Sequence, residues 1–484
     1  MKYDLFDNAR NEYDDIDHIL YQVLENRGVV NPPHYIKMMD DASVTHDFNL
    51  LTNIDRARDR YLKAIENNEN IHILVDCDVD GYSSTSMVYN YTVNDMGYNN
   101  VSYSIHTGKQ HGLSKDIIIP EGVQLLIIPD ASSNEQHKHK QLKEERDIDI
   151  IILDHHEVDN YKEEEQTAII VNNQLCDYPN KELSGAGIVY KFLQAVDEEM
   201  WQDCADKYLD LVALSLIGDS MDIRELETRH YINKGLRNVR NEALKGFIDR
   251  RAWDMKGKIS MNNIAFLVSP LINAIIRIGK QDEKDLMFKA FTEQYMTLKY
   301  KKRGEDELID EVIYERVPRL ATNARSRQAR QIDKALEIAT EAINNNKSYE
   351  NNLIVVDGDG ISKSLTGILA IKIASQYKKP CIVIRKDEKT GLYSGSGRNI
   401  DYSSIDNLRD YINQTGFANA EGHDSAFGIM DLKEENIDLL VEHFNNDDSV
   451  KENVYLVDFI VPFDNLSDEL IYTLNQSKEH WGMG

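Results

Sequence analysis

Two apolar runs in the sequence end in clustered acidic and imidazole side chains. Residues 71–81 read IHILVDCDVDG, and residues 150–158 read IIILDHHEV. Each run has the length and composition of a buried strand, and its charged end could not remain unpaired in a core. In the first run Asp76, Asp78 and Asp80 alternate, so an extended backbone would point them to one side. This pattern is typical of strand ends that gather metal ligands.

Two further segments bring acids to what we expect to be the same edge of a sheet. Residues 123–128 (VQLLII) precede Asp130, and the apolar, strand-like or buried residues 209–217 precede Asp219. Helix-like stretches alternate with these runs, at residues 83–95, 134–145 and 185–196. This alternation predicts an α/β fold with a parallel, doubly wound sheet. In such open sheets ligands bind at the carboxyl edge of the strands.

Carboxylates together with imidazole favour Mn²⁺ or Mg²⁺ over a closed zinc site. So many carboxylates suit two ions about 3.5–4 Å apart, the arrangement that hydrolyses phosphoesters. A single Asp after a strand is more often a helix cap or a turn residue. Capping does not explain three acids within five residues together with Asp154, His155 and His156 in succession. We therefore expect a metal site.

The order of these motifs resembles the DHH phosphoesterase superfamily, and over nearly the whole chain it resembles the RecJ-type single-strand-specific exonucleases. The residues that carry the likeness are LENRG at 24–28, DCDVDG at 76–81, PD at 129–130, DHH at 154–156, GD at 218–219, SPLINA with Arg277 at 269–277, TGILA at 366–370, GSGR at 395–398 and GH at 422–423. The resemblance implies a parallel-sheet DHH domain joined by a long helix to a smaller α/β DHH-associated domain. The expected parts are an N-terminal helical segment at 1–70, the catalytic domain at 71–315, a linker helix at 316–350 and a substrate-binding domain at 351–484.

The resemblance also implies how the two ions are held. Asp76 and Asp130 would bind one ion. Asp78, Asp130, His155 and Asp219 would bind the other. Asp130 would then bridge the two ions.

Other residues would support or complete this site. Asp80 would be a metal ligand or an outer acceptor, Asp154 would orient the neighbouring imidazole, and His156 would contact the scissile phosphate. The residues implied in binding the nucleotide backbone are Asn273, Arg277, Gly397, Arg398, Gly422 and His423. His72 lies four residues before Asp76, where some relatives carry a metal-binding His, and an ordinary strand histidine is the alternative.

The implied function is a divalent-metal phosphodiesterase that degrades single-stranded DNA from 5′ to 3′ and releases mononucleotides in DNA recombination, repair or replication. Two other functions stay open: hydrolysis of short oligonucleotides or cyclic dinucleotides, as in smaller DHH proteins, and a non-catalytic scaffold in replication. The intact metal motifs argue against a scaffold. The segments at 24–28 and 269–277, which the small oligonucleotide hydrolases lack, favour the RecJ type.

The sequence departs from the family at Ser362, Ile276 and Asn399, which spares the metal ligands but affects the expected contacts with substrate. Bacterial RecJ proteins also continue into an OB-fold, which binds single strands through a basic groove and stacking aromatics. This chain ends at Gly484, so we expect weaker or partner-dependent binding of long DNA. A single-strand-binding protein or another replication or recombination protein is the expected partner.

Charge and composition bound the remaining choices. The net charge is −28, whereas nucleic-acid-binding proteins usually carry a basic footprint. The arginine-rich segment 316–330, which leads into a long helix expected at 322–343, would compensate if it lined the cleft. The absence of an apolar run near 18 residues argues against a membrane-spanning helix and a membrane partner. The acidic N-terminus and four scattered cysteines fit a reduced, cytoplasmic compartment.

Overall fold

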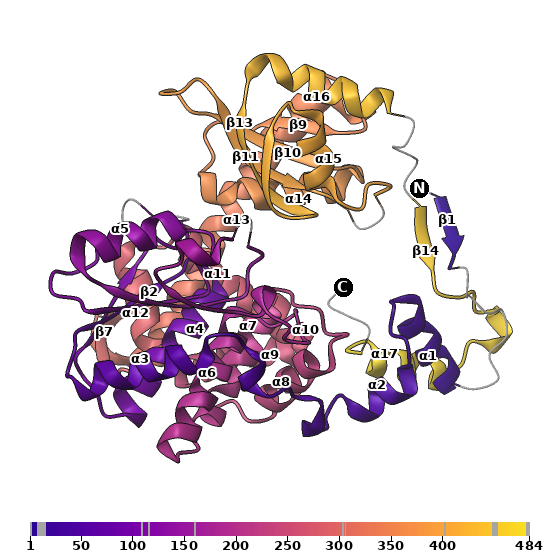
Figure 1. Ribbon diagram of the computed structural model, residues 1–484. Helices are drawn as coiled ribbons and strands as arrows, with labels where there is room; N and C mark the ends of the chain where they lie inside the picture. Colours follow the sequence, from indigo (N-terminus) through magenta and orange to yellow (C-terminus); the bar gives the residue numbers. More distant parts are fainter. Residues whose placement is uncertain are drawn as a thin grey trace. The chain divides into compact units, whose positions relative to one another are not determined.

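The computed structural model describes residues 2–6, 16–107, 110–114, 117–158, 161–302, 304, 306–400, 403–447 and 454–480. The chain packs into two compact units, which we call the larger and the smaller unit. The larger unit comprises Arg27–Arg325 and Tyr472–Gly484, and the smaller unit comprises Met1–Asn26 and Ser326–Ile471. The long helix α13, Ile313–Asn345, runs from one unit into the other (Figure 1). The four-part division drawn from the sequence stays a prediction.

The larger unit is built on a five-stranded sheet whose strands are all parallel. The strands, in spatial order, are β3 (Val101–Ile105), β2 (Ile71–Val75), β4 (Leu125–Pro129), β5 (Asp149–Asp154) and β6 (Ile169–Asn172). The chain passes from β2 to β3 on one side and then returns to β4 on the other. The strand order therefore reverses between β2 and β4, which is the place where α/β sheets bind ligands.

The larger unit also contains helices, including ones at the three stretches that the sequence predicts to be helical (Figure 1). They are α2 (Pro32–Met38), α3 (Ile54–Glu66), α4 (Val79–Asn90), α5 (Gln136–Arg146), α6 (Gly185–Met200), α7 (Leu209–Gly218), α8 (Leu226–Arg237), α9 (Glu242–Met255), α10 (Met261–Asn263), α11 (Ser269–Ile278) and α12 (Gln281–Phe291), followed by the hairpin β7 (Thr297–Lys301) and β8 (Leu308–Val312). The apolar run at 209–217 is helix α7 and not a strand. All nine of its residues are buried, so it shows no amphipathic period by which sequence could separate helix from strand.

The expectation that no apolar run approaches membrane-spanning length is wrong for one segment. Among the described residues, Met261–Ile278 forms 18 helical residues with a mean hydropathy of 1.4. Half of this segment is buried inside the protein, including Val268, Ile272 and Ile275, which belong to the main hydrophobic core. Its composition is therefore explained by packing in the larger unit.

The smaller unit contains a mixed five-stranded sheet, which completes the predicted α/β fold class. The strands, in spatial order, are β12 (Asn419–His423), β13 (Ala426–Leu432), β11 (Tyr393–Arg398), β10 (Cys381–Lys386) and β9 (Ile354–Asp357). Within this sheet only β9 and β10 run parallel, and they are joined by the helix α14 (Thr366–Tyr377). The other elements are α1 (Ile16–Asn26), α15 (Leu408–Thr415), α16 (Glu434–Asn446) and the parallel pair β1 (Lys2–Leu5) and β14 (Val454–Val457), and α17 (Asp468–Ser477) crosses the boundary between the units.

Candidate metal centre

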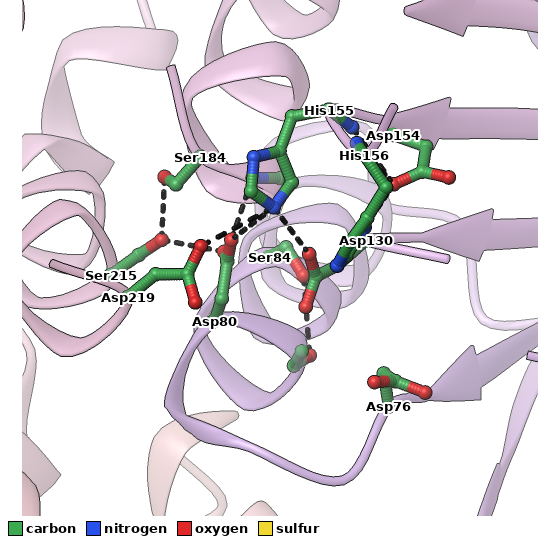
Figure 2. A network of polar contacts seen from close by, with 12 residues as sticks. Asp76, Asp80, Ser84, Asp130, Asp154, His155, His156, Ser184, Ser215 and Asp219 are labelled. Carbon is green, nitrogen blue, oxygen red and sulfur yellow. Dashed lines mark hydrogen bonds and ion pairs between the residues drawn. The ribbon is translucent and has the colours of Figure 1, made fainter. Parts of the chain in front are cut away.

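The predicted metal ligands of the larger unit lie together at the carboxyl edge of the parallel sheet (Figure 2). Asp76 follows β2, Asp130 follows β4, and Asp154 is the last residue of β5. Asp80 lies in the first turn of α4, and Asp219 directly follows α7. Parallel strands end at one edge, so residues far apart in sequence meet there.

His155 occupies the centre of this cluster, with a side chain that is 5% exposed. Its Nε2 lies 3.3 Å from an oxygen of Asp130, 3.4 Å from Asp219 and 3.6 Å from Asp80 (Figure 2). Among the described residues, Nε2 has no hydrogen-bond partner of good geometry. A buried nitrogen that faces three carboxylates without a hydrogen bond fits a site that would share a cation among these groups.

The carboxylate of Asp130 is in the same situation as Nε2 of His155. Both of its carboxylate oxygens are buried and lack a hydrogen-bond partner within the described part of the chain. Burial, and then the charges of neighbouring carboxylates led by Asp80, raise the pKa of Asp130 well above its usual range. Its backbone is left-handed, with φ of 63°, a conformation that Asp tolerates better than most residues. Gly185 keeps room for it, because a Cβ there would lie 2.6 Å from the Cβ of Asp130.

Asp80 is already engaged by the protein. Its carboxylate accepts hydrogen bonds from the backbone N–H groups of Gly185 and Ala186 at 2.6 and 2.8 Å and from Ser215 Oγ at 2.5 Å. Burial chiefly raises the pKa of Asp80, to about 6, although His155 opposes the shift. These contacts fix the start of α6 against α4. The geometry favours the outer-acceptor alternative for Asp80 over direct metal ligation.

Asp154 and His156 form a closely bonded pair. Asp154 accepts hydrogen bonds from His156 Nδ1 at 2.7 Å and from the backbone N–H groups of Ser133, His155 and His156. Burial alone would raise the pKa of Asp154, but the charge of His156 outweighs it and the pKa is lowered. Burial likewise opposes protonation of His156, yet Asp154 raises the pKa of His156 to about 10. His156, whose side chain is 46% exposed, thus presents a cation at the edge of the site.

Asp76 and Asp78 lie on the β2 side of the centre. Asp78 caps α4 by accepting from the backbone N–H of Gly81 at 2.9 Å. A Cβ at Gly81 would lie 2.5 Å from the Cβ of Asp76, which explains the glycine of the DCDVDG motif. Arg277 on α11 interacts electrostatically with this side of the centre. Burial lowers the pKa of Arg277, and the charge of Asp78 opposes that shift. Asn273 lies one turn earlier on the same helix.

The alternatives for His72 are decided by its contacts. Both ring nitrogens lie within hydrogen-bond distance of serine hydroxyls on β3, Ser102 at 2.8 Å and Ser104 at 3.0 Å. His72 is therefore an ordinary strand histidine. Two histidines that the sequence analysis did not select, His106 and His111, lie beside Asp76 instead. The available signal was that His106 follows a strand end, as the selected acids do.

Four groups of three side chains place possible ligand atoms within 4.8 Å of one another among the described residues. They are Asp76–Cys77–His111, Asp76–Asp78–Asp130, Asp130–His155–His156 and Asp80–His155–Asp219. Asp130 belongs to a group on each side, so it is placed to bridge. Buried oxygen and imidazole donors in this number suit divalent cations of the Mn²⁺ or Mg²⁺ type, and their unpartnered atoms fit that occupant.

The substrate-binding residues predicted in the smaller unit lie on its sheet. The GSGR motif forms the end of β11 and is not a turn. Its glycines serve packing, because a Cβ at Gly397 would lie 2.3 Å from the ring of Phe427. Arg398 donates to the carbonyl of Gly397 at 2.6 Å, and Gly422 adopts φ of 124° beside the exposed His423 on β12.

Part of the arginine-rich segment is not available to line a cleft. Arg316 Nη1 lies 3.0 Å from Glu311, and Arg319 binds the same carboxylate through Nε and Nη2 at 2.8 and 2.6 Å. The Arg319 guanidinium also lies 3.7 Å from the ring centroid of Tyr300. These two arginines therefore hold the β7–β8 hairpin against α13.

Comparison with known proteins gives concordant results. A model described as the DHH family, N-terminal domain, matches residues 70–216. A putative SPbeta prophage-derived single-strand DNA-specific exonuclease, YorK, of Bacillus subtilis is 38% identical over 471 residues, which cover 96% of this chain and 80% of the relative. The single-stranded-DNA-specific exonuclease RecJ of Bacillus subtilis is 26% identical over 87% of this chain and 51% of its own length.

The fold also matches solved structures. The crystal structure of RecJ in complex with Mn²⁺ from Thermus thermophilus superposes with a TM-score of 0.69 at 16% identity, over 99% of this chain and 67% of that protein. A manganese-bound exonuclease RecJ matches with a TM-score of 0.60 at 17% identity, over 83% of this chain and 95% of the other. At this level of identity the match supports the fold.

Proposed function

The chain belongs to the DHH family of single-strand-DNA-specific exonucleases that includes YorK and RecJ, and we propose that it is itself a divalent-metal-dependent exonuclease of single-stranded DNA. The observation that carries the proposal is that, within the described part of the chain, the buried carboxylate oxygens of Asp130 and Nε2 of His155 have no hydrogen-bond partner at the centre of the carboxylate cluster. A scaffold would gain stability by losing them, because unpartnered buried polar groups are costly. A catalytic site needs them to hold cations.

In this proposal one ion is held by Asp76 and Asp130 and the other by Asp78, Asp130, His155 and Asp219. Two Mn²⁺ or Mg²⁺ ions bound there would supply an activated water nucleophile and stabilise the developing charge on the phosphate. Asp80 and Asp154 would act as positioning residues through the hydrogen bonds described above.

Cationic side chains of the larger unit would bind the substrate phosphate. His156 is placed for this role because Asp154 keeps it protonated and its ring is half exposed. Arg277 would neutralise charge near Asp78, with Asn273 on the same face of α11 contacting the backbone. These contacts are made to phosphates, which every sequence shares, so they would bind DNA without base specificity.

The smaller unit would bind the strand through Arg398 and His423. Gly422 would allow close approach of the strand, and Gly397 would act indirectly, by keeping β11 packed on Phe427 beside Arg398. We propose that hydrolysis proceeds from the 5′ end and releases mononucleotides, in line with the family. We also propose a cytoplasmic location, supported by four cysteines that are all unpaired in the structure. A single-strand-binding protein or another replication or recombination protein is the proposed partner.

The test measures kcat/KM with Mn²⁺ for strands from a dinucleotide to about 30 nucleotides, at two salt concentrations. Each phosphate contact should add about 0.7 to the steepness with which the logarithm of affinity falls against the logarithm of salt concentration. Asp78→Asn prepared in parallel controls for contaminating nucleases. We expect kcat/KM to rise with length until the strand fills the site and then level off, with a shallow slope. A maximum at the dinucleotide would indicate an oligonucleotide or cyclic-dinucleotide hydrolase, and no turnover at any length would leave the scaffold.

A further inference from the structure

His106 is buried beside Asp76, and it belongs neither to the metal ligands nor to the substrate contacts proposed above. It directly follows β3, and because Ile105 pairs with Val75 in the parallel register, His106 and Asp76 leave adjacent strands side by side. The side chain of His106 is 1% exposed, and its Nε2 lies 3.9 Å from Asp76 Oδ1. Among the described residues this Nε2 has no hydrogen-bond partner. It is too far from Asp76 for a direct bond, yet suitably placed for both atoms to contact one ion between them.

The hydrogen bonds behind His106 leave Nε2 free to act as a ligand. Ser114 Oγ lies 3.3 Å from His106 Nδ1 and donates its own proton to Gln110 Oε1 at 2.7 Å. The hydroxyl is therefore left to accept, so that Nδ1 of His106 carries the proton and Nε2 carries the lone pair. Metal-binding histidines in proteins are commonly fixed in this way, by an acceptor behind the ring nitrogen that does not bind the metal.

His111 contacts the other oxygen of the same carboxylate. Its Nδ1 lies 2.5 Å from Asp76 Oδ2, while the backbone N–H of Gly112 donates to Asp76 Oδ1 at 3.1 Å. A direct bond at this distance leaves no space for an ion between His111 and Asp76. The contact instead fixes the rotation of the Asp76 carboxylate.

We propose that His106 is a third protein ligand of the ion held by Asp76 and Asp130, and that His111 is a positioning residue that orients Asp76. The inference rests on the proposed function, because it assumes that this ion binds. The metal-binding histidine is then not His72, the candidate from the sequence, but His106 at the end of the neighbouring strand. Since imidazole is a softer donor than carboxylate or water, the added nitrogen favours Mn²⁺ over Mg²⁺ at this position.

The test measures Mn²⁺ binding directly, without substrate. Calorimetric titration gives the number and affinity of the sites, and electron spin-echo spectroscopy of the bound Mn²⁺ counts the directly coordinated imidazole nitrogens. The variants are His106→Gln, which keeps polarity and approximate volume, Ser114→Ala and His111→Gln. The matched control is His72→Gln, a buried histidine on the adjacent strand whose nitrogens are both occupied by serines.

We expect two ions in the wild type, with nitrogen couplings from two imidazoles, those of His155 and His106. His106→Gln should retain one coupling, weaken one site by at least about 10-fold and lower the ratio of Mn²⁺ to Mg²⁺ affinity, and Ser114→Ala should weaken the same site by about 10-fold. His72→Gln and His111→Gln should keep both couplings. If His106→Gln keeps both, or if the lost coupling is that of His111, the assignment is overturned. If the wild type binds no Mn²⁺, the proposed function itself fails.

Discussion

Asp130→Asn should stabilise the metal-free protein while abolishing its activity. The substitution removes one negative charge from a buried cluster of carboxylates. It also gives the side chain an N–H donor in reach of His155 Nε2, which lies 3.3 Å from an Asp130 oxygen. Asn is preferred to Ala because it tolerates the left-handed backbone, with φ of 63°, at this position.

The expected size follows from the unpartnered oxygens of Asp130. Each unpartnered buried polar group costs about 1–3 kcal/mol, and Asn removes one acceptor and the charge. A gain of about 1–3 kcal/mol corresponds to a rise in Tm of about 1.5–5 °C in EDTA for a unit of this size. Activity should fall below about a tenth of the wild-type value, since a lost bridging ligand costs several kcal/mol of barrier.

The effect should also depend on pH in a defined direction. Burial, and then the neighbouring carboxylates, raise the pKa of Asp130, so the folded protein holds this proton more tightly than the unfolded chain. The stability that the wild type gains from binding this proton is fully present below the unfolded Asp pKa of about 4 and is lost as pH rises through the raised pKa of Asp130. The Tm advantage of the variant in EDTA should therefore grow with pH.

Thermal unfolding with EDTA and with Mn²⁺ checks this prediction. Asp147→Asn is the matched control, because Asp147 is also left-handed, with φ of 50°, but its side chain is 89% exposed and outside the site. The control should change stability by less than about 0.5 kcal/mol and keep the Mn²⁺-dependent rise in Tm. A lower Tm for Asp130→Asn in EDTA, or an unchanged response to Mn²⁺, would refute the reasoning.

Three further substitutions test other parts of the site. His156→Gln should lower kcat/KM by about 10- to 100-fold, the worth of a charged hydrogen bond to phosphate, and an unchanged kcat/KM would remove His156 from the substrate contacts. Arg398→Ala should raise KM more than it lowers kcat, whereas Lys372→Ala, which breaks an exposed ion pair between α14 and Asp333 of α13, should change neither. Equal effects of the two substitutions would contradict specific binding of the strand by Arg398. Gly185→Ala should reduce both Tm and Mn²⁺ affinity, because the new Cβ would collide with Asp130. The control Gly187→Ala, whose Cβ would meet only the Leu183 side chain at 3.1 Å, should largely preserve Mn²⁺ affinity. Similar losses of Mn²⁺ affinity in both variants would indicate a general effect on the helix.

The sequence was sufficient where strand composition and motif spacing agree. The buried run 71–75 and the acids after it predicted both the parallel sheet and the edge at which Asp76 lies. It was insufficient where an element is buried on every side: α7 has no polar face, so its apolar run fits strand and helix equally well. Asp219 was still predicted correctly at the end of this segment, because it follows the apolar run whether that run is a helix or a strand.

Contacts between distant segments were the other limit. No local pattern indicates that Glu311 neutralises Arg316 and Arg319, and counting arginines therefore overstated the charge available to DNA. His106 was missed because β3 is only partly buried and its sequence, VSYSI, carries a weaker strand signal than the neighbouring runs. Its relation to Asp76 depends on the register of two parallel strands, which the sequence does not specify.

Digestion of end-labelled DNA tests whether the protein hydrolyses single strands from the 5′ end in a metal-dependent reaction. A single strand labelled at its 5′ or 3′ end, and the same strand in a blunt duplex, would be incubated with the protein in Mn²⁺ and in EDTA. We predict that the 5′ label is released first as a mononucleotide, only from the single strand and only with the metal. Release of the 3′ label first, digestion of the duplex at an equal rate, or hydrolysis in EDTA would contradict it.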